Sequence, residues 1–343
     1  MIKKNRLNAL YVSGDDIEFT NTKLYDLVDS FYSLGGRFVI VDEVHKYKNW
    51  SQEVKNIYDT FLDLKLIISG SSMLNILYEK FDLSRRLVSV TMPHLSFREF
   101  LELKNNTTYK KYDLQTILQD ATSISKELVL SNKTLYKEFK EYLKYGAYPF
   151  FLEGKENYLE KLNNAIEKII NEDIPSINKI EFAKLTVFEK LIYLVTVANK
   201  PFLVNMASLS RELNVSEPTL YTYFNILEKS SIFKLLKKAS KRVSKKPNKL
   251  LFANTNILYA YANKLFLEPN IGVIRETFFA NCFENIYYSD IGDFKVYEYI
   301  FEVGGKNKDF KQIKDINNSY LAVDIDFSTN NKKIPLWLFG FLR

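Results

Sequence analysis

Two adjacent carboxylates, Asp42 and Glu43, directly follow the apolar run from Phe38 to Val41. A run this short and rich in β-branched residues, without polar alternation, predicts a parallel strand that is buried on both faces. The carboxylates would then lie at the carboxyl end of the strand, where open α/β sheets bind their ligands. In a nucleotide-hydrolysing site, the first carboxylate would hold Mg²⁺ through water and the second would polarise the attacking water. The alternative is a strand that ends in two solvated acids, because such a pattern is common by chance.

Hydroxyl and guanidinium groups follow the next apolar run. The Ser-Gly-Ser-Ser loop at 69–72 would lie at the same sheet edge as the carboxylates, where a hydroxyl such as that of Ser71 could sense a terminal phosphate or orient water. Arg85 and Arg86 come shortly afterwards, and arginine is suited to bidentate phosphate contact and to stabilising a transferring phosphoryl group. The alternative is that both arginines pair with local acids such as Asp82.

Strands and helices must alternate to bring these groups together. The hydrophobic spacing predicts helices at 23–34 and 53–62, because their apolar residues recur on one helical face. Between and after them it predicts strands at 8–13, 38–42, 64–69 and 87–92. This alternation is typical of a parallel sheet. Ser96, with Glu99 three residues later, predicts a capping box at the start of the next helix.

A second pattern in the middle of the chain concerns nucleic acid. Short helices at 188–197, 206–213 and 217–229, followed by a strand at 232–236, predict a winged helix-turn-helix. Its third helix carries Thr219, Tyr221 and Thr222, which could reach base edges or phosphates where they lie on the outer face. The segment 234–249 is basic and contains no acid; its candidate phosphate contacts are Lys238, Lys241, Arg242, Lys245 and Lys246. The alternative is a solvated hairpin on a module that packs only against protein.

A third group of residues lies near the C-terminus. Glu276 lies in a predicted helix at 275–285 and Glu302 in predicted strands at 295–303, with Asp293 just before these strands and Lys306 just after them. This order resembles the core of restriction-endonuclease-like nucleases. There two carboxylates would bind Mg²⁺, and a lysine would stabilise the developing phosphate charge. A working site places acid and lysine two residues apart on one strand, whereas Lys306 follows Glu302 by four. This spacing favours a retained scaffold over an active nuclease.

Composition limits the remaining classes. The formal net charge of +7 favours an anionic partner without requiring one. One cysteine, Cys282, excludes a disulfide framework within the chain and fits a reducing cytoplasm. The two histidines are too few for a histidine-rich metal site. No apolar run approaches the length of about 20 residues that a membrane helix requires, so we expect a cytoplasmic protein without a membrane partner.

Taken in order, several motifs resemble one protein family. Val-Asp-Glu-Val-His at 41–45, Asn-Trp-Ser-Gln-Glu-Val-Lys at 49–55, Ser-Gly-Ser-Ser at 69–72, Leu-Ser-Arg-Arg at 83–86 and Leu-Ser-Phe-Arg-Glu-Phe at 95–100 are similar to those of an uncharacterised prokaryotic family of AAA-type P-loop ATPases. The resemblance implies Walker B roles for Asp42 and Glu43, with ATP and Mg²⁺ as cofactors. It also implies a C-terminal domain of unknown function and a possible homo-oligomer, in which an arginine reaches the neighbouring nucleotide.

The sequence departs from this family at its start. It contains no Gly-Lys-Thr or Gly-Lys-Ser phosphate loop, and its Gly-Gly pairs are at 35–36 and 304–305. The family's sheet order would place the missing strand beside 64–69. We therefore expect weak ATP binding or none. A gene start placed too late, a natural fragment and a degenerate relative are the three explanations, and the surviving acids and arginines favour the first.

The expected fold class is α/β: a truncated P-loop NTPase parallel sheet, then a helical and winged-helix domain, then a small α+β restriction-endonuclease-like domain. The expected boundaries are 1–103 for the ATPase core, 104–185 for a helical linker, 186–250 for the winged helix and 251–343 for the nuclease-like domain. Besides an ATPase that acts with nucleic acid, the residues leave open a DNA-binding protein with an inert ATPase remnant, or a protein–protein scaffold.

Overall fold

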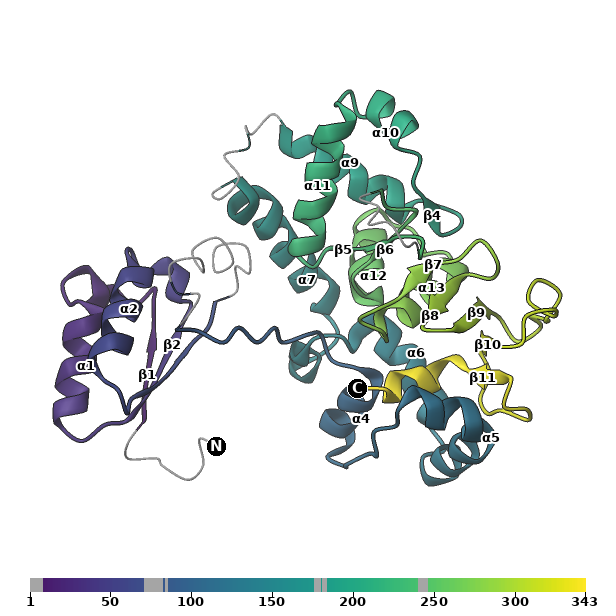
Figure 1. The fold of residues 1–343 in the computed structure, drawn as a ribbon, viewed down its shortest axis with the longest axis horizontal. Coiled ribbons are helices and arrows are strands. Elements are labelled where there is room, and N and C mark those ends of the chain that lie inside the picture. The colour runs from purple at the N-terminus through teal and green to yellow at the C-terminus, as the bar shows by residue number, and fades with distance from the viewer. Residues whose placement is uncertain (1–8, 71–82, 84–85, 176–179, 181–183, 240–245) are drawn as a thin grey trace. The chain divides into compact units, whose positions relative to one another are not determined.

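The computed structural model describes residues 9–70, 83, 86–175, 180, 184–239 and 246–343 (Figure 1). The chain forms two compact units. The first comprises Met1–Met92 with Asn171–Ile180, and the second comprises Pro93–Ile170 with Glu181–Arg343. The expected division into four finer segments stays a prediction.

The first unit is an α/β layer built on a parallel sheet. Its elements in chain order are β1 (Ala9–Ser13), the 3-10 helix η2 (Ile17–Thr20), α1 (Leu24–Ser33), β2 (Phe38–Asp42), the 3-10 helix η3 (Val44–Lys46), α2 (Trp50–Thr60) and β3 (Lys65–Ile68). The strands are parallel in the order β1-β2-β3, which places β2 in the centre. The predicted alternation of strands and helices is therefore confirmed.

Among the described residues, the helices of this unit cover one face of its sheet and leave the other open. Val39 and Val41 of β2 are fully buried in a core that includes Val28 of α1 and Val54 of α2. The alternate residues of the sheet point the other way, and among them Ile67 of β3 remains 49% exposed. The prediction that β2 is buried on both faces is thus wrong for the described residues, because α1 and α2 pack on the same side.

The expected strand at 87–92 is also wrong. These residues belong to no strand in the structure. Val88, Val90 and Met92, which alternate along the segment, are each more than four-fifths exposed. The sequence has the period of a strand, but a strand needs a hydrogen-bonding neighbour, and none of the described strands pairs with this segment.

The second unit begins with a helical layer. Its helices are α4 (Phe97–Asn105), α5 (Leu114–Ser131), α6 (Leu135–Tyr145), the 3-10 helix η5 (Pro149–Glu153), α7 (Tyr158–Lys168) and the π-helical turn η6 (Ile169–Asp173), the last of which runs into the first unit. Ser96 caps α4 together with Glu99, which confirms the predicted capping box. Within the described ranges, none of the helices combines the length and the apolar character needed to cross a bilayer.

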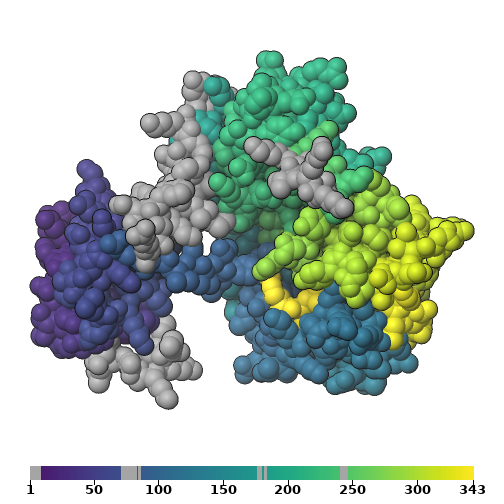
Figure 2. All heavy atoms as spheres, viewed as in Figure 1, coloured from purple at the N-terminus to yellow at the C-terminus, as the bar shows by residue number. Residues whose placement is uncertain are grey.

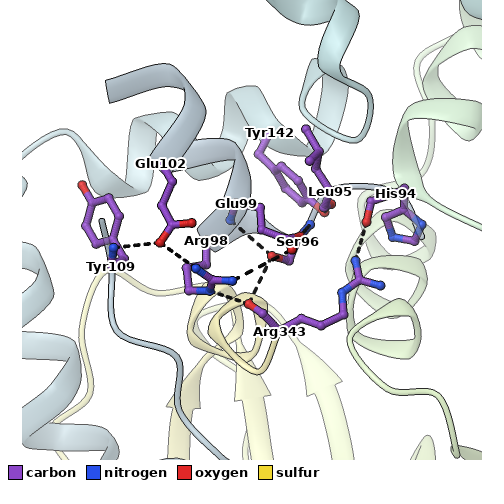
Figure 3. A network of polar contacts seen from close by, with 9 residues as sticks. All are labelled: His94, Leu95, Ser96, Arg98, Glu99, Glu102, Tyr109, Tyr142 and Arg343. Carbon is purple, nitrogen blue, oxygen red and sulfur yellow. Dashed lines mark hydrogen bonds and ion pairs between the residues drawn. The ribbon is translucent and has the colours of Figure 1, made fainter. Parts of the chain in front are cut away.

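The end of the chain packs against the beginning of this unit (Figure 3). The carbonyl oxygen of Arg343 accepts hydrogen bonds from Arg98 Nε at 2.6 Å and from Ser96 Oγ at 3.3 Å. The hydroxyl of Tyr142 donates to the carbonyl of Leu95 at 2.7 Å. Hydrogen bonds therefore join the segment at 94–98 to Arg343, about 250 residues later in the chain.

Three helices and a small sheet follow. The elements are α9 (Leu185–Thr196), β4 (Phe202–Leu203), α10 (Met206–Glu212), α11 (Glu217–Lys229), β5 (Phe233–Leu236) and β6 (Lys249–Phe252). The strands are antiparallel in the order β4-β6-β5. The predicted succession of helices and strand is present, with boundaries shifted by a few residues at most.

A five-stranded mixed sheet completes the unit, in the order β11-β10-β9-β8-β7. Its elements are α12 (Thr255–Lys264), α13 (Ile271–Asn281), β7 (Tyr287–Tyr288), β8 (Phe294–Val296), β9 (Tyr299–Gly304), β10 (Ser319–Val323), β11 (Lys333–Pro335) and the 3-10 helix η8 (Leu336–Phe341). Residues 311–315, between β9 and β10, form turns. In the space-filling view, the helices and strands of this unit pack closely (Figure 2).

Candidate functional sites

The carboxylate of Asp42 is held by groups from all three strands of the first unit. Tyr11 of β1 donates its hydroxyl to Asp42 Oδ2 at 2.7 Å. The Ser69 hydroxyl, directly after β3, donates to Oδ1, and the backbone N–H of Glu43 donates to Oδ1 at 3.0 Å. The Ser69 hydrogen bond, followed by that of Tyr11, holds the pKa of Asp42 below its ordinary value. The side chain is therefore an ionised carboxylate at the carboxyl end of the central strand.

The register of the strands explains this convergence. Ser13 pairs with Asp42, so Tyr11, two residues earlier, lies on the same face of the sheet as the carboxylate. The N–H of Ser69 donates to the carbonyl of Val41 at 2.9 Å, and the N–H of Val44 donates to the carbonyl of Ser69 at 2.9 Å. The backbone thus fixes the Ser69 hydroxyl beside Asp42, where it can support a hydrated Mg²⁺ ligand.

Glu43 has an unusual backbone conformation. Its φ of 46° lies in the left-handed region, which a non-glycine residue adopts at a cost of about 1 kcal/mol or more. Gly14 packs against this turn, and a Cβ at Gly14 would lie 2.6 Å from the carbonyl oxygen of Glu43. His45 Nε2 lies 3.6 Å from Glu43 Oε2. The second carboxylate therefore follows Asp42 directly, on a strained turn against which Gly14 packs.

The other residues predicted for this site are only partly described. Ser71 and Arg85, and Asp82 as the alternative partner, lie outside the described residues. Arg86 forms a bidentate pair with Asp59 of α2, through Nε at 2.8 Å and a terminal nitrogen at 3.0 Å. The structure therefore places Arg86 against a helix, and its role toward phosphate stays a prediction.

The predicted recognition helix α11 presents a modest polar face. Thr219 Oγ1 lies 2.8 Å from the capping Ser216 Oγ, and Thr222 Oγ1 donates to the carbonyl of Pro218 at 3.1 Å. Tyr221 is half-buried, whereas Thr222 and Asn225 are exposed. The two threonine hydroxyls are therefore engaged by the helix itself, which leaves fewer free groups for base edges than the sequence suggested.

The basic segment divides into exposed and buried parts. Lys241, Arg242 and Lys245 lie outside the described residues. Lys238 and Lys246 are exposed, and Lys238 forms an ion pair with Asp290. Two further lysines of the segment are not surface groups. Lys234 donates to the carbonyl of Ala280 at 2.8 Å near the end of α13, and burial lowers its pKa to about 8; the other, Lys249, is 4% exposed.

The C-terminal carboxylates come together with two lysines. Lys249 Nζ lies 2.6 Å from Glu276 Oε2 and 3.9 Å from Asp293 Oδ1. Lys308 forms an ion pair with Glu302. The structure thus brings Lys308 to this cluster in the place predicted for Lys306, whose carbonyl accepts a hydrogen bond from Lys333 Nζ at 2.9 Å.

Gly304 makes room for Lys308. A Cβ at Gly304 would lie 2.7 Å from Cγ of Lys308 and 2.8 Å from its Cβ. The lysine stem therefore occupies the space that a side chain two residues after Glu302 would take. A turn closed by the N–H of Lys308 on the carbonyl of Gly305, at 3.0 Å, brings the stem back over the strand.

Burial dominates the electrostatics of this cluster. It raises the pKa of Glu276, and the ion pair with Lys249 offsets only part of that effect. Burial also raises the pKa of Glu302. Among the described residues, no three His, Cys, Asp or Glu side chains are grouped so as to hold a metal ion. The charges of Lys249 and Lys308 therefore neutralise those of the carboxylates with which they pair.

Sequence reasoning missed Tyr11, Lys249, Lys308 and Asp290. Tyr11 could have been found from strand register, because it is two residues before the position that pairs with Asp42. Lys249 gave no separate signal, since it stands among many lysines that are exposed. Lys308 depends on a turn that no local pattern specifies. Asp290 meets Lys238 only through tertiary structure.

Comparison with known protein families matches two separate parts of the chain. Residues 1–101 match the family model described as AAA domain, and residues 136–266 match a domain of unknown function. With the parallel sheet and the acid at its carboxyl end, the first match supports the AAA-type family that the motifs indicated. The AAA match covers less than a third of the chain.

The individual relatives carry no assigned role. An uncharacterised protein of Methanocaldococcus jannaschii is 29% identical over 242 residues, which cover 67% of this chain and 50% of that protein. An uncharacterised protein of Haemophilus influenzae is 27% identical over 204 residues, covering 57% of this chain and 44% of that protein. The chain thus spans about half the length of the curated relatives it matches.

A solved structure of a Thermotoga maritima RuvB mutant was also found. It has 11% sequence identity and a TM-score of 0.26 over 78% of this chain and 81% of that one. A TM-score this low does not establish that the two proteins share a fold.

Proposed function

We propose that the first unit provides the metal-binding and water-activating half of an ATP-hydrolysing site, which a phosphate-binding loop completes. One observation carries the proposal: the Asp42 carboxylate is held ionised by Ser69 and Tyr11 at the carboxyl end of the central parallel strand. In this role Asp42 would hold Mg²⁺ through water, and Glu43 would polarise the attacking water.

The open side of the sheet supports the same proposal. Among the described strands β3 pairs only with β2, so its other edge has no strand beside it. A strand that enters beside β3, turns through a Gly-Lys-Thr loop and continues as a helix would use that edge. Its helix would cover the face on which Ile67 is exposed. The loop amides and lysine would then bind phosphates near Asp42.

The metal role of Asp42 can be tested in a chain extended by such a loop. In this protein, Asp42→Asn should weaken the Mg²⁺-dependent part of binding to a fluorescent ATP analogue by about tenfold to a hundredfold, because a charged contact is worth roughly 1.5–3 kcal/mol. Asp63→Asn is the matched control, because Asp63 precedes β3 and so lies at the amino end of the parallel strands, away from Asp42. Its carboxylate accepts a hydrogen bond from Arg37 Nε at 2.8 Å. An unchanged response to Mg²⁺ in Asp42→Asn would refute the role.

We propose, as a second function, that the second unit binds nucleic acid through a winged helix. The specific observation is the succession α9, β4, α10, α11, β5 and β6 with the sheet order β4-β6-β5, which is the topology of that motif. Lys238 and Lys246 are exposed at the two ends of the loop that joins β5 to β6. Such a loop can lie along a phosphate backbone.

The salt dependence of duplex binding tests this function. The full chain should bind a mixed-sequence DNA duplex with an affinity that falls as KCl rises. Replacing both Lys238 and Lys246 by alanine should lower the slope of log K against log salt by about 1.8, because each phosphate contact contributes about 0.9. Lys264→Ala, in an exposed pair between α12 and Glu167 of α7, is the control. Binding that does not respond to salt, or no binding at 50 mM KCl, would exclude this function.

For Glu276, Asp293 and Glu302 we propose a retained scaffold in preference to an active nuclease. The support is that Lys249 forms an ion pair with Glu276 and Lys308 forms one with Glu302, so that lysines neutralise the carboxylates that a metal ion would need. The cluster then stabilises the junction of α13 with β8 and β9.

A further inference from the structure

The loop between β5 and β6 is joined at its base to the C-terminal sheet. The backbone N–H of Tyr288 in β7 donates to the carbonyl of Lys237 at 2.9 Å, and Lys238 forms a parallel bridge with Tyr288. Within the base, the N–H of Lys238 donates to Asn248 Oδ1 at 2.9 Å. We call residues 237–239 and 246–248 the hairpin stem. The hairpin stem and β7 are therefore hydrogen-bonded neighbours in the second unit (Figure 1).

A buried lysine fixes the position of this stem. Lys249, the first residue of β6, places its ammonium 2.6 Å from Glu276 of α13 and 4.7 Å from the ring centre of Phe294 in β8. A paired charge that is almost fully buried resists displacement, because separating it would leave a desolvated carboxylate. Any ligand bound along the hairpin stem must consequently pass close to the turn between β7 and β8.

That turn carries an acid aimed at the stem. Asp290 forms an ion pair with Lys238, and their side chains are 55% and 54% exposed. The pair is solvent-exposed, so it is weak and exchanges easily for another anion. A backbone phosphate presents the same chemistry to Lys238 as the Asp290 carboxylate does, with more acceptor oxygens.

Exposed side chains continue the surface beyond Asp290. Tyr287 is 41% exposed and Ile291 is 50% exposed. Lys295 of β8 pairs across the strands with Tyr287, so the two side chains share one face of the sheet. An aromatic ring beside a lysine is suited to a nucleotide base and its phosphate.

We infer that the hairpin stem and the β7–β8 turn form one nucleic-acid interface, in which Asp290 occupies Lys238 in the free protein and a backbone phosphate replaces it on binding. This inference rests on the proposed nucleic-acid binding of the second unit. In this role Asp290 competes with the phosphate for Lys238, and so lowers the affinity of the second unit for nucleic acid.

The test is duplex affinity measured by fluorescence anisotropy with the full chain and a labelled 30-base-pair DNA of mixed sequence, at several KCl concentrations. Asp290→Asn should bind about threefold to tenfold more tightly at low salt, because Lys238 is released for a phosphate and a repelling charge is removed. In a Lys238→Ala background, the same substitution should give much less gain. Asp309→Asn, in an exposed pair with Lys311 at 3.1 Å, is a control of equal charge change that should leave the affinity within about twofold.

Three outcomes overturn the inference. If Asp290→Asn does not tighten binding while wild type binds DNA in a salt-dependent way, the competitor role fails and the proposed function stands. If the gain is equally large in the Lys238→Ala background, or in Asp309→Asn, it reflects net charge and not exchange at Lys238. If neither wild type nor Asp290→Asn binds the duplex at 50 mM KCl, the inference and the proposed function fail together.

Discussion

A chain in which residue 1 is preceded by a strand, a Gly-Lys-Thr loop and a helix is expected to bind Mg-ATP at least about a thousandfold more tightly than the 343 residues alone. Such a loop supplies several charge-assisted hydrogen bonds from backbone amides and a lysine, each worth roughly 1.5–3 kcal/mol. Three of them amount to about 4.5 kcal/mol or more, which corresponds to this change in affinity.

The site that would receive the loop is already organised. Tyr11 and Ser69 each donate a hydrogen bond to the Asp42 carboxylate, so its orientation is fixed by the fold and little further ordering is needed when Mg²⁺ binds. The extension needs the open edge of β3 for its strand. The matched control is an extension whose loop lysine is replaced by alanine, which keeps the strand and helix and removes one phosphate contact. Equal nucleotide affinity in the two extended proteins would show that the loop does not act on phosphate.

The second large effect concerns stability. Asn256→Ala is expected to lower the free energy of unfolding of the second unit by about 4 kcal/mol, because a fully buried amide satisfies several groups at once. Its Oδ1 accepts from the N–H of Ala147 at 2.8 Å and from the hydroxyl of Tyr158. Its Nδ2 donates to the carbonyls of Tyr142 and Leu143 at 3.0 Å each, at the end of α6.

Alanine at position 256 would leave these buried groups without partners, at roughly 1–3 kcal/mol for each that finds no substitute. Urea unfolding followed by the fluorescence of Trp337, in a Trp50→Phe background, reports on the second unit alone, since Trp50 lies in the first. Asn263 lies at an exposed position of α12, the helix that also contains Asn256. Asn263→Ala should therefore change the free energy of unfolding by no more than about 0.5 kcal/mol. A loss below 1 kcal/mol for Asn256→Ala would contradict the role assigned to the amide.

Local patterns in the sequence predicted much of this fold. The predicted helix at 217–229 is present with the same bounds as α11. Ser96 and Glu99 form the predicted capping box. The strand β2 ends at Asp42, so the carboxylate lies at the predicted edge of the sheet. In each case the determining interactions lie within a few residues of one another.

Features that depend on distant partners could not be predicted. The segment 87–92 has the alternation of a strand, yet a strand also requires a neighbour in the sheet. Lys308 reaches Glu302 because Gly304 lacks a side chain and a turn follows it, which residue spacing does not reveal. Lys238 and Asp290 meet across 52 residues. The candidate sites therefore needed tertiary structure, although Asp42 and Glu43 were evident from sequence.

Isothermal titration of Mg-ATP into the 343-residue chain tests the central claim most directly, namely that Asp42 and Glu43 belong to a nucleotide site that these residues alone do not complete. We expect no saturable heat at micromolar nucleotide, with a Kd weaker than about 1 mM, and a Kd about a thousandfold tighter for the chain extended by the phosphate loop. A micromolar Kd for the 343-residue chain would contradict it, and so would an extended chain that binds no better.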